Sequence, residues 1–181
     1  MKQINLFFLF IIMSRLGFSQ AISDTDIAGY KQEIQAESQK LRQELLQKDN
    51  PYDCNIQMVV NFQIDTFLIE RFQAKMESID ESTAGICQSL YNLEADYDKL
   101  LNKYYQMLLK KLNNEDKKLL KQSQLNWLSY RDSERELNNE IAKEEYSGGG
   151  SMQLTFIAYH YADITKKRVF ELFHYLNRIS K

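Results

Sequence analysis

Side chains that could bind a metal or a cofactor are few in this 181-residue sequence, and they do not cluster. The two histidines, His160 and His174, lie far apart in the chain, and only Asp163 follows one of them at helical spacing. Structural and catalytic metal sites need three or four converging His, Cys, Asp or Glu ligands. We therefore predict two surface or half-buried histidines, no metal site and no cofactor.

Nucleophilic catalysis is not indicated either. The sequence contains no serine flanked by glycines as in a nucleophile elbow, and glycines 148–150 lack the lysine of a phosphate-binding loop. Carboxylate pairs such as Glu144-Glu145 are common on solvated helix faces. We predict that the protein is not an enzyme.

The segment QSQLNWLSYRD, residues 122–132, combines the only tryptophan with charged and amide side chains. At 100° per residue, Gln124, Trp127 and Arg131 share one face of a helix, with Asp132 at its edge. A buried guanidinium costs several kcal/mol unless it is paired and hydrogen-bonded. We therefore predict a buried polar network that joins three helices and fixes their register. Its further members are Asp98, Asn102 and Tyr105 from the preceding helix, and Thr165 and Arg168 from the following one.

The composition favours long helices, because the chain has a single proline and six glycines. Helical spacing of apolar residues, with capping residues at the corners, predicts helices over about 24–48, 55–80, 82–113, 115–145 and 152–179. Residues 55–80 also contain a strand-like alternation, VVNFQID, but the helical pattern is longer. The sequence therefore predicts an all-α bundle of about four to five helices with short corners, whose first helix is a loosely docked arm.

Residues 1–20 are predicted to be a secretory signal peptide. Lys2 gives a positive start, residues 4–13 are almost entirely apolar, and residues 17–19 or 19–21 fit a cleavage site between small side chains. A membrane span would need about twenty apolar residues. We expect an exported chain, periplasmic or secreted, without a membrane span and without an N-terminal lipid-anchor cysteine.

The charge balance argues against one class of partner. Removal of Lys2 and Arg15 with the signal peptide leaves 21 basic residues against 25 acidic ones, so the formal net charge moves from −2 to −4. A mildly acidic domain is a poor nucleic-acid binder. We predict a protein partner and no nucleic acid.

The two cysteines, Cys54 and Cys87, could form a disulfide in an exported chain. Helix geometry opposes this, because a straight helix over residues 55–79 is about 37 Å long. A disulfide requires Cα atoms within about 7 Å, so the segment would have to fold back on itself. Both possibilities stay open on these arguments.

Four fragments, in order, resemble the LprI-like family of lysozyme inhibitors, a group of small exported bacterial proteins. They are DKLLNKYY (residues 98–105), SQLNWLSYRD (123–132), GGGS (148–151) and TKKR (165–168). The resemblance covers about residues 82–176. YDC (residues 52–54) and AGIC (84–87), which precede these four fragments, resemble cysteine-bearing segments of some members, which adds weight to a Cys54–Cys87 disulfide.

With the signal peptide (1–20) and the N-terminal helical arm and extension (21–81) read from the residues themselves, the resemblance adds an LprI-like helical domain over residues 82–181. Many members carry a pair of cysteines at the positions that Arg135 and His160 occupy here. The last two helices are therefore expected to be held together by packing.

The resemblance also implies that the protein binds and occludes lysozyme, which would protect the cell wall. The alternative is an envelope interaction or structural module without lysozyme inhibition. The cleft of lysozyme contains two catalytic carboxyl groups. A protruding loop of the inhibitor could plug this cleft. The candidate partner-binding loop is the glycine-rich corner with Glu144, Glu145, Tyr146, Gly149, Gly150 and Ser151. The alternative for this corner is a flexible turn between helices.

Overall fold

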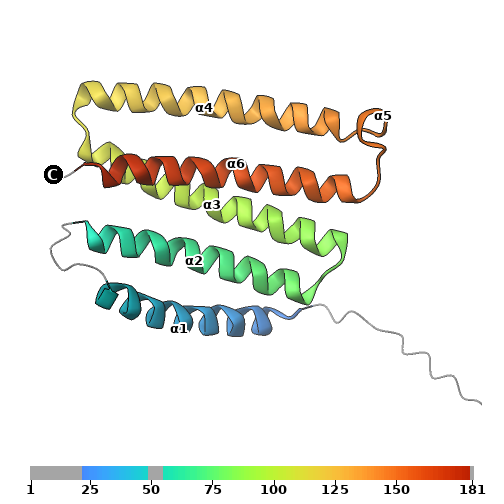
Figure 1. Cartoon of the computed structure of the whole chain (residues 1–181), viewed down its shortest axis with the longest axis horizontal. Helices are drawn as coiled ribbons and strands as arrows, with labels where there is room; N and C mark the ends of the chain where they lie inside the picture. Colours follow the sequence, from blue (N-terminus) through green and yellow to red (C-terminus); the bar gives the residue numbers. More distant parts are fainter. Residues whose placement is uncertain (1–21, 49–54, 180–181) are drawn as a thin grey trace, which may run out of the picture.

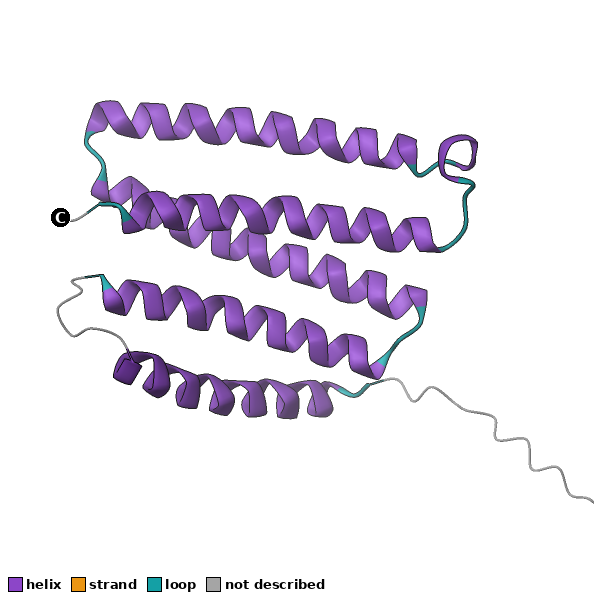
Figure 2. Ribbon diagram, in the orientation of Figure 1, coloured by secondary structure: helices purple, strands orange, loops and turns teal. Residues whose placement is uncertain are grey.

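The computed structural model describes residues 22–48 and 55–179, which form six helices (Figure 1). These are α1 (Asp24–Lys48), α2 (Ile56–Ile79), α3 (Thr83–Lys111), α4 (Asn114–Ile141), α5 (Glu144–Ser147) and α6 (Met152–Asn177). This part of the chain contains no strand (Figure 2). The all-α prediction is therefore confirmed, and the ambiguous segment after residue 55 is a helix.

The predicted number of helices, about four to five, is too low because the connection between α4 and α6 contains one more helical turn. α4 ends at Ile141, whereas the sequence predicts a helix to about Glu145. Lys143 has an extended backbone, with φ −64° and ψ 152°. This residue interrupts the helical hydrogen bonding, so Glu144–Ser147 forms a separate turn, α5.

Side-chain caps explain where α3 and α4 begin. Ser82 Oγ accepts a hydrogen bond from the Gly85 N–H at 3.1 Å. Asn113 Oδ1 accepts from the N–H groups of Glu115 and Asp116, each at 2.9 Å. Such caps satisfy N–H groups that have no partner within the helix and contribute about 1 kcal/mol each. α4 therefore begins at the corner between the helices that the sequence predicts over about 82–113 and 115–145, with Asn113 as the cap.

The main hydrophobic core lies between α2, α3 and α6, while α1 and α4 lie at opposite edges of the molecule (Figure 1). α3 and α6 run in the same direction and make the most extensive contact between two elements. Phe62 of α2 stacks on Phe173 of α6, with ring centroids 3.8 Å apart, and meets Tyr104 of α3 edge-on. α2 therefore shares one core with the helices that follow it. α3 buries an apolar stripe that includes Leu90, Tyr97, Leu101, Tyr104 and Leu108.

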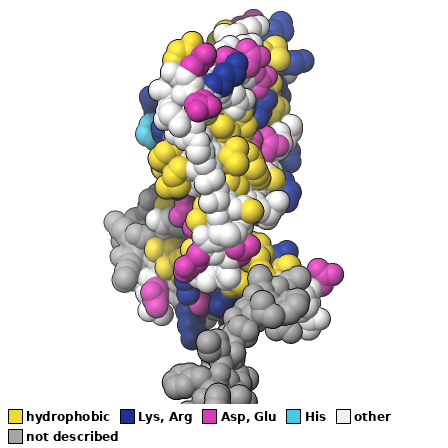
Figure 3. Space-filling view, turned by 90° about the vertical axis from the view of Figure 1, so that its right-hand side faces the viewer, with side chains coloured by type: hydrophobic (Ala, Val, Ile, Leu, Met, Phe, Trp, Pro, Cys, Tyr) yellow, Lys and Arg dark blue, Asp and Glu magenta, His cyan; other side chains and the backbone are white. Residues whose placement is uncertain are grey.

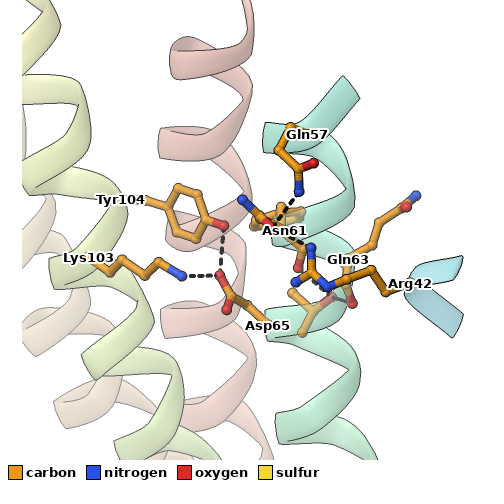
Figure 4. A network of polar contacts seen from close by, with 9 residues as sticks. Arg42, Gln57, Asn61, Gln63, Asp65, Lys103 and Tyr104 are labelled. Atoms are coloured by element: carbon orange, nitrogen blue, oxygen red, sulfur yellow. Dashed lines mark hydrogen bonds and ion pairs between the residues drawn. The ribbon is translucent and has the colours of Figure 1, made fainter. Parts of the chain in front are cut away.

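Polar side chains connect α1 to α2 and α2 to α3. Among the α1 side chains that the structure describes, two are buried, Ile34 and Ser38. Arg42 of α1 donates to Asn61 Oδ1 of α2 at 2.6 Å (Figure 4). The loose docking of α1 as an arm stays a prediction.

One helical turn along α2 from Asn61, Asp65 faces α3 (Figure 4). Its Oδ2 accepts from Lys103 Nζ at 2.5 Å and from the Tyr104 hydroxyl at 2.9 Å. The burial of Tyr104, followed by the nearby Asp65 carboxylate, raises the pKa of this phenol. Tyr104 therefore stays protonated and donates to Asp65 from within the core.

Candidate functional site

The buried guanidinium of the α4–α6 interface belongs to Arg168 of α6. Its side chain is 5% exposed. Its nitrogen atoms donate to Gln124 Oε1 at 3.1 Å, to Ser123 Oγ at 3.1 Å and to Glu171 Oε2 at 2.9 Å. Its guanidinium carbon lies 5.9 Å from the centroid of the Trp127 ring. These hydrogen bonds and the ion pair offset the desolvation of the charge.

Two of these partners, Ser123 and Glu171, are absent from the sequence-based prediction. Glu171 follows Arg168 at i+3, a spacing at which opposite charges meet on a helix, so the sequence contained a signal for it. Ser123 precedes Gln124 directly, and its contact depends on how α4 is rotated against α6. Sequence spacing within one helix does not report that rotation.

Arg131, which helical angles place at the centre of the buried face, lies at its edge in the structure. Its side chain is 19% exposed, and Nε and Nη2 pair with the neighbouring Asp132 at 2.9 and 2.7 Å. Its guanidinium carbon lies 5.3 Å from the Trp127 ring centroid. The face of α4 that is buried is narrower than expected, because α4 packs mainly on α6. A long arginine at the margin of such a face can keep its charge in water.

The α3 members of the expected network are not buried. Asp98 and Asn102 are exposed, and Asn102 Nδ2 donates to the backbone oxygen and to Oδ2 of Asp98, at 3.1 and 3.4 Å. Thr165 of α6 is 1% exposed, but its hydroxyl has no hydrogen-bond partner among the residues described. In place of one buried network across three helices, the structure has a buried α4–α6 cluster around Arg168, and the α3 side chains lie outside it.

Asp98, Asn102 and Tyr105 line an open groove between α3 and α4 with a volume of about 230 Å³. Trp127 and Gln124 form part of its α4 side. The other lining residues are Leu101, Lys121, Leu125 and Leu128. The groove therefore brings together residues of the first two fragments that carry the family resemblance.

The corner between α4 and α6 is a hydrogen-bonded turn with an exposed tip. Tyr146 is 69% exposed. Ser147 Oγ donates to the Ala142 carbonyl at 2.9 Å and accepts from the Gly149 N–H at 3.1 Å. Glycines 148–150 have φ values of 77°, 72° and 94°, a region that favours glycine. These hydrogen bonds favour a fixed turn over a flexible one.

Hydrophobic side chains are exposed on both sides of this corner. On α4, Tyr130, Leu137 and Ile141 are 54%, 54% and 53% exposed. None of the described elements packs on this side of α4. Met152 and Phe156 are exposed at the start of α6. Figure 3, viewed from the α5 end, shows hydrophobic side chains beside acidic ones at the surface.

The predicted Cys54–Cys87 pairing stays a prediction, because Cys54 lies outside the described residues. The buried Cys87 thiol lies 3.7 Å from the Thr155 hydroxyl, near the start of α6. Asn55, the first described residue after Cys54, donates to the Asn177 carbonyl at the end of α6, at 3.0 Å. These two contacts lie at opposite ends of α6.

The two histidines do not form a metal site with other side chains of the described residues. His160 is partly buried and His174 is exposed. In residues 22–48 and 55–179, no group of three or more His, Cys, Asp or Glu side chains could hold a metal ion.

A second polar cluster connects α2, α3 and α6. Glu70 Oε1 accepts from the Tyr97 hydroxyl and from Lys166 Nζ, both at 2.6 Å. Burial raises the pKa of Glu70, but the hydrogen bonds from Lys166 and Tyr97 outweigh it and hold this pKa below its ordinary value. Burial, and then Glu70 itself, raise the pKa of Tyr97, so the phenol remains a donor.

Glu70→Gln is expected to destabilise the protein near neutral pH and to matter less in acid. The folded-state pKa of Glu70 is lowered, so its contribution is present above its unfolded-state pKa and is lost as the pH falls through the folded-state value. The side chain is 46% exposed, so the effect should stay below about 1 kcal/mol. Thermal melts of both proteins from about pH 7 to about pH 3 measure it. A difference that does not change with pH would contradict this role.

The family model described as lysozyme inhibitor LprI matches residues 74–172, more than half of the chain. The chain belongs to the LprI lysozyme inhibitor family. The match begins within α2, before the residue 82 that the sequence fragments indicate, and ends within α6. The LprI region thus includes the α3–α4 groove, the Arg168 cluster and the α5 corner. No curated protein and no solved structure matches the chain.

Among the described helices, none is both long enough and apolar enough to cross a membrane.

Proposed function

We propose that this protein is an exported inhibitor that binds lysozyme and occludes its cleft, and so protects the cell wall. The observation that carries the proposal is the match of residues 74–172 to the LprI family. The signal-peptide pattern of residues 1–20 supports export to the periplasm or beyond it. We propose a binding function only and assign no catalytic residue.

The α5 corner is the part of the surface that we propose enters the cleft. Glycosidases of the lysozyme type hold two carboxyl groups in their cleft. The carboxylates of Glu144 and Glu145 would be repelled there, so we propose that the Tyr146 side chain is the part that inserts. Ser147 holds the turn in place before binding. Such preorganisation reduces the conformational entropy that is lost on binding.

Tyr146→Ala is expected to weaken lysozyme inhibition by about tenfold to a hundredfold, as for an aromatic anchor at the centre of an interface. Ser151→Ala is expected to act in the same direction with a smaller effect. Tyr175→Ala is the matched control, because Tyr175 is 43% exposed near the other end of α6. The measurement is the inhibition constant against several lysozyme types, with cell-wall clearing as the readout.

Two results would contradict the proposal at different levels. Unchanged inhibition constants for both Tyr146→Ala and Ser151→Ala would exclude the corner as the inserting element. Failure of the unsubstituted protein to inhibit any lysozyme type would contradict the function itself.

An envelope interaction module without lysozyme inhibition is the second candidate. The exposed hydrophobic side chains of α4 and α6, among them Leu137 and Phe156, favour it. Large exposed apolar patches often mark protein interfaces. Specific capture of one envelope protein, lost in Leu137→Asp and combined with an absence of inhibition, would favour this candidate over the first.

A further inference from the structure

The groove between α3 and α4 carries hydrogen-bonding groups that the described part of the chain leaves without a partner. The Asn102 nitrogen donates to Asp98, so its amide oxygen remains an acceptor. The Gln124 oxygen accepts from Arg168 Nε, so its amide nitrogen remains a donor. The Tyr105 hydroxyl and the Trp127 indole N–H, which also belong to groove residues, form no hydrogen bond within the described part of the chain.

The two amides of the groove are oriented by neighbouring side chains. Arg168 can only donate, so its hydrogen bond fixes which end of the Gln124 amide points away from it. Asp98 accepts a hydrogen bond from the Asn102 amide nitrogen, so the Asn102 amide oxygen is the end that points away from Asp98. The α3 side of the groove therefore offers an acceptor and the α4 side a donor, before any ligand arrives.

Apolar surface lies beside these polar atoms. Trp127 and Tyr105 contribute aromatic rings, and Leu101, Leu125 and Leu128 contribute aliphatic side chains. An aromatic face is electron-rich and attracts C–H groups that carry partial positive charge. A sugar ring combines such C–H faces with hydroxyl groups at its rim, each of which can donate and accept.

The charges of the groove balance. Asp98 and Lys121 have opposite signs, so their formal charges cancel. The two guanidiniums near Trp127 have partners of their own, since Arg131 pairs with Asp132 and Arg168 with Glu171. Neither an anion nor a cation therefore gains a net Coulomb attraction from the groove as a whole.

We propose that the α3–α4 groove binds one pyranose ring of a neutral glycan. Trp127 and Tyr105 line the groove with aromatic side chains, and Asn102 and Gln124 provide the acceptor and the donor for ring hydroxyls. The groove volume of about 230 Å³ lies below the range of about 300 Å³ and above that is typical of pockets for drug-sized ligands. This size fits one ring rather than several. The site is separate from the α5 corner and does not rest on lysozyme inhibition.

Trp127 provides a direct test, because it is the only tryptophan of the chain. Chitotriose and cellotriose, both neutral, are titrated into the full mature protein while tryptophan fluorescence is recorded. A saturable change with at least one of them is the expected result. Asn102→Ala and Gln124→Ala should each weaken binding by about tenfold, the effect of one lost hydrogen bond.

Asn126→Ala is the matched control, because Asn126 is an exposed amide of α4 that bonds to Gln122 outside the groove. Its affinity should equal that of the unsubstituted protein, and circular dichroism confirms that all variants are folded. No saturable change with either oligosaccharide would overturn the proposal, and so would equal weakening by Asn126→Ala. Tighter binding of argininamide, lost in Asp98→Asn, would also overturn it, because the groove would then be a site for a cationic side chain. Tyr146→Ala should leave the titration unchanged, so the two proposals can fail separately.

Discussion

Phe62→Ala is expected to lower the free energy of unfolding by about 3 to 5 kcal/mol, the range for loss of a buried phenylalanine. Phe62 is 5% exposed and stacks on Phe173 at 3.8 Å. It also meets Tyr104 and Phe170 edge-on, at 5.2 and 4.9 Å. The substitution removes these contacts and leaves a cavity between α2, α3 and α6. Since domains are stable by about 5 to 15 kcal/mol, this is a large fraction of the total.

Urea unfolding followed by circular dichroism and by Trp127 fluorescence measures this effect. Both signals should shift together, because α2 shares a core with α3 and α6, and Trp127 of α4 packs against that core. Phe156→Ala is the matched control, since Phe156 is 55% exposed, and it should change stability by no more than about 0.5 kcal/mol. A fluorescence transition that stays in place while the helical signal shifts would show residues 21–81 to be a separate unit.

Arg168→Ala is expected to lower the free energy of unfolding by about 3 kcal/mol. The substitution removes three hydrogen bonds that a charged group donates, each worth at most about 1.5 to 3 kcal/mol. Water that reaches the freed acceptor groups recovers part of this free energy. Glu171 is 52% exposed, so its carboxylate is not left buried and unpaired. Lysine cannot reproduce the three-way geometry of the guanidinium, so Arg168→Lys should be nearly as destabilising.

Arg131→Ala is the comparison that isolates burial from charge. Arg131 also lies beside Trp127, but it is 19% exposed and pairs with its neighbour Asp132. Its loss should cost less than about 1 kcal/mol. Denaturant unfolding of the three variants measures the difference. Equal destabilisation by Arg131→Ala and Arg168→Ala would contradict the assignment of Arg168 as the buried guanidinium.

Features that depend on local spacing could be predicted from the sequence. The stripe from Leu90 to Leu108 identifies the buried face of α3, because that helix is covered on one broad side. The cap at Asn113 also depends only on the residues that follow it. Both features follow from helix geometry and backbone hydrogen bonding, without knowledge of the tertiary arrangement.

Features that depend on how many helices surround an element could not be predicted. Phe62 does not belong to the apolar spacing from Ile56 to Ile79 that identifies α2, yet it contacts both α3 and α6. A helix with several neighbours buries a wider arc than one stripe describes. α4 is the opposite case, since it packs mainly on one helix and leaves Leu137 and Ile141 exposed.

In the candidate site, too, some features could be predicted from local spacing and others depend on how the helices pack. The sequence correctly brings Gln124, Trp127 and Arg168 together, because the polar residues of a helix face need partners. It does not show that Asp98 and Asn102 stay at the surface, because their burial depends on the separation of α3 and α4. The open groove between these helices is therefore a finding of the three-dimensional structure.

The shared direction of α3 and α6 has a consequence for folding kinetics. A tight turn can join only antiparallel helices, so the 40 residues from 112 to 151 must carry the chain back along the molecule before α6 can pair with α3. Closing a loop of this length costs about 3 kcal/mol of chain entropy. The contact that buries most of the core is thus also one of the least local, and folding should be slower than in a bundle of successive helical hairpins. α4 then serves as the tether that limits the search of α6 for its partner.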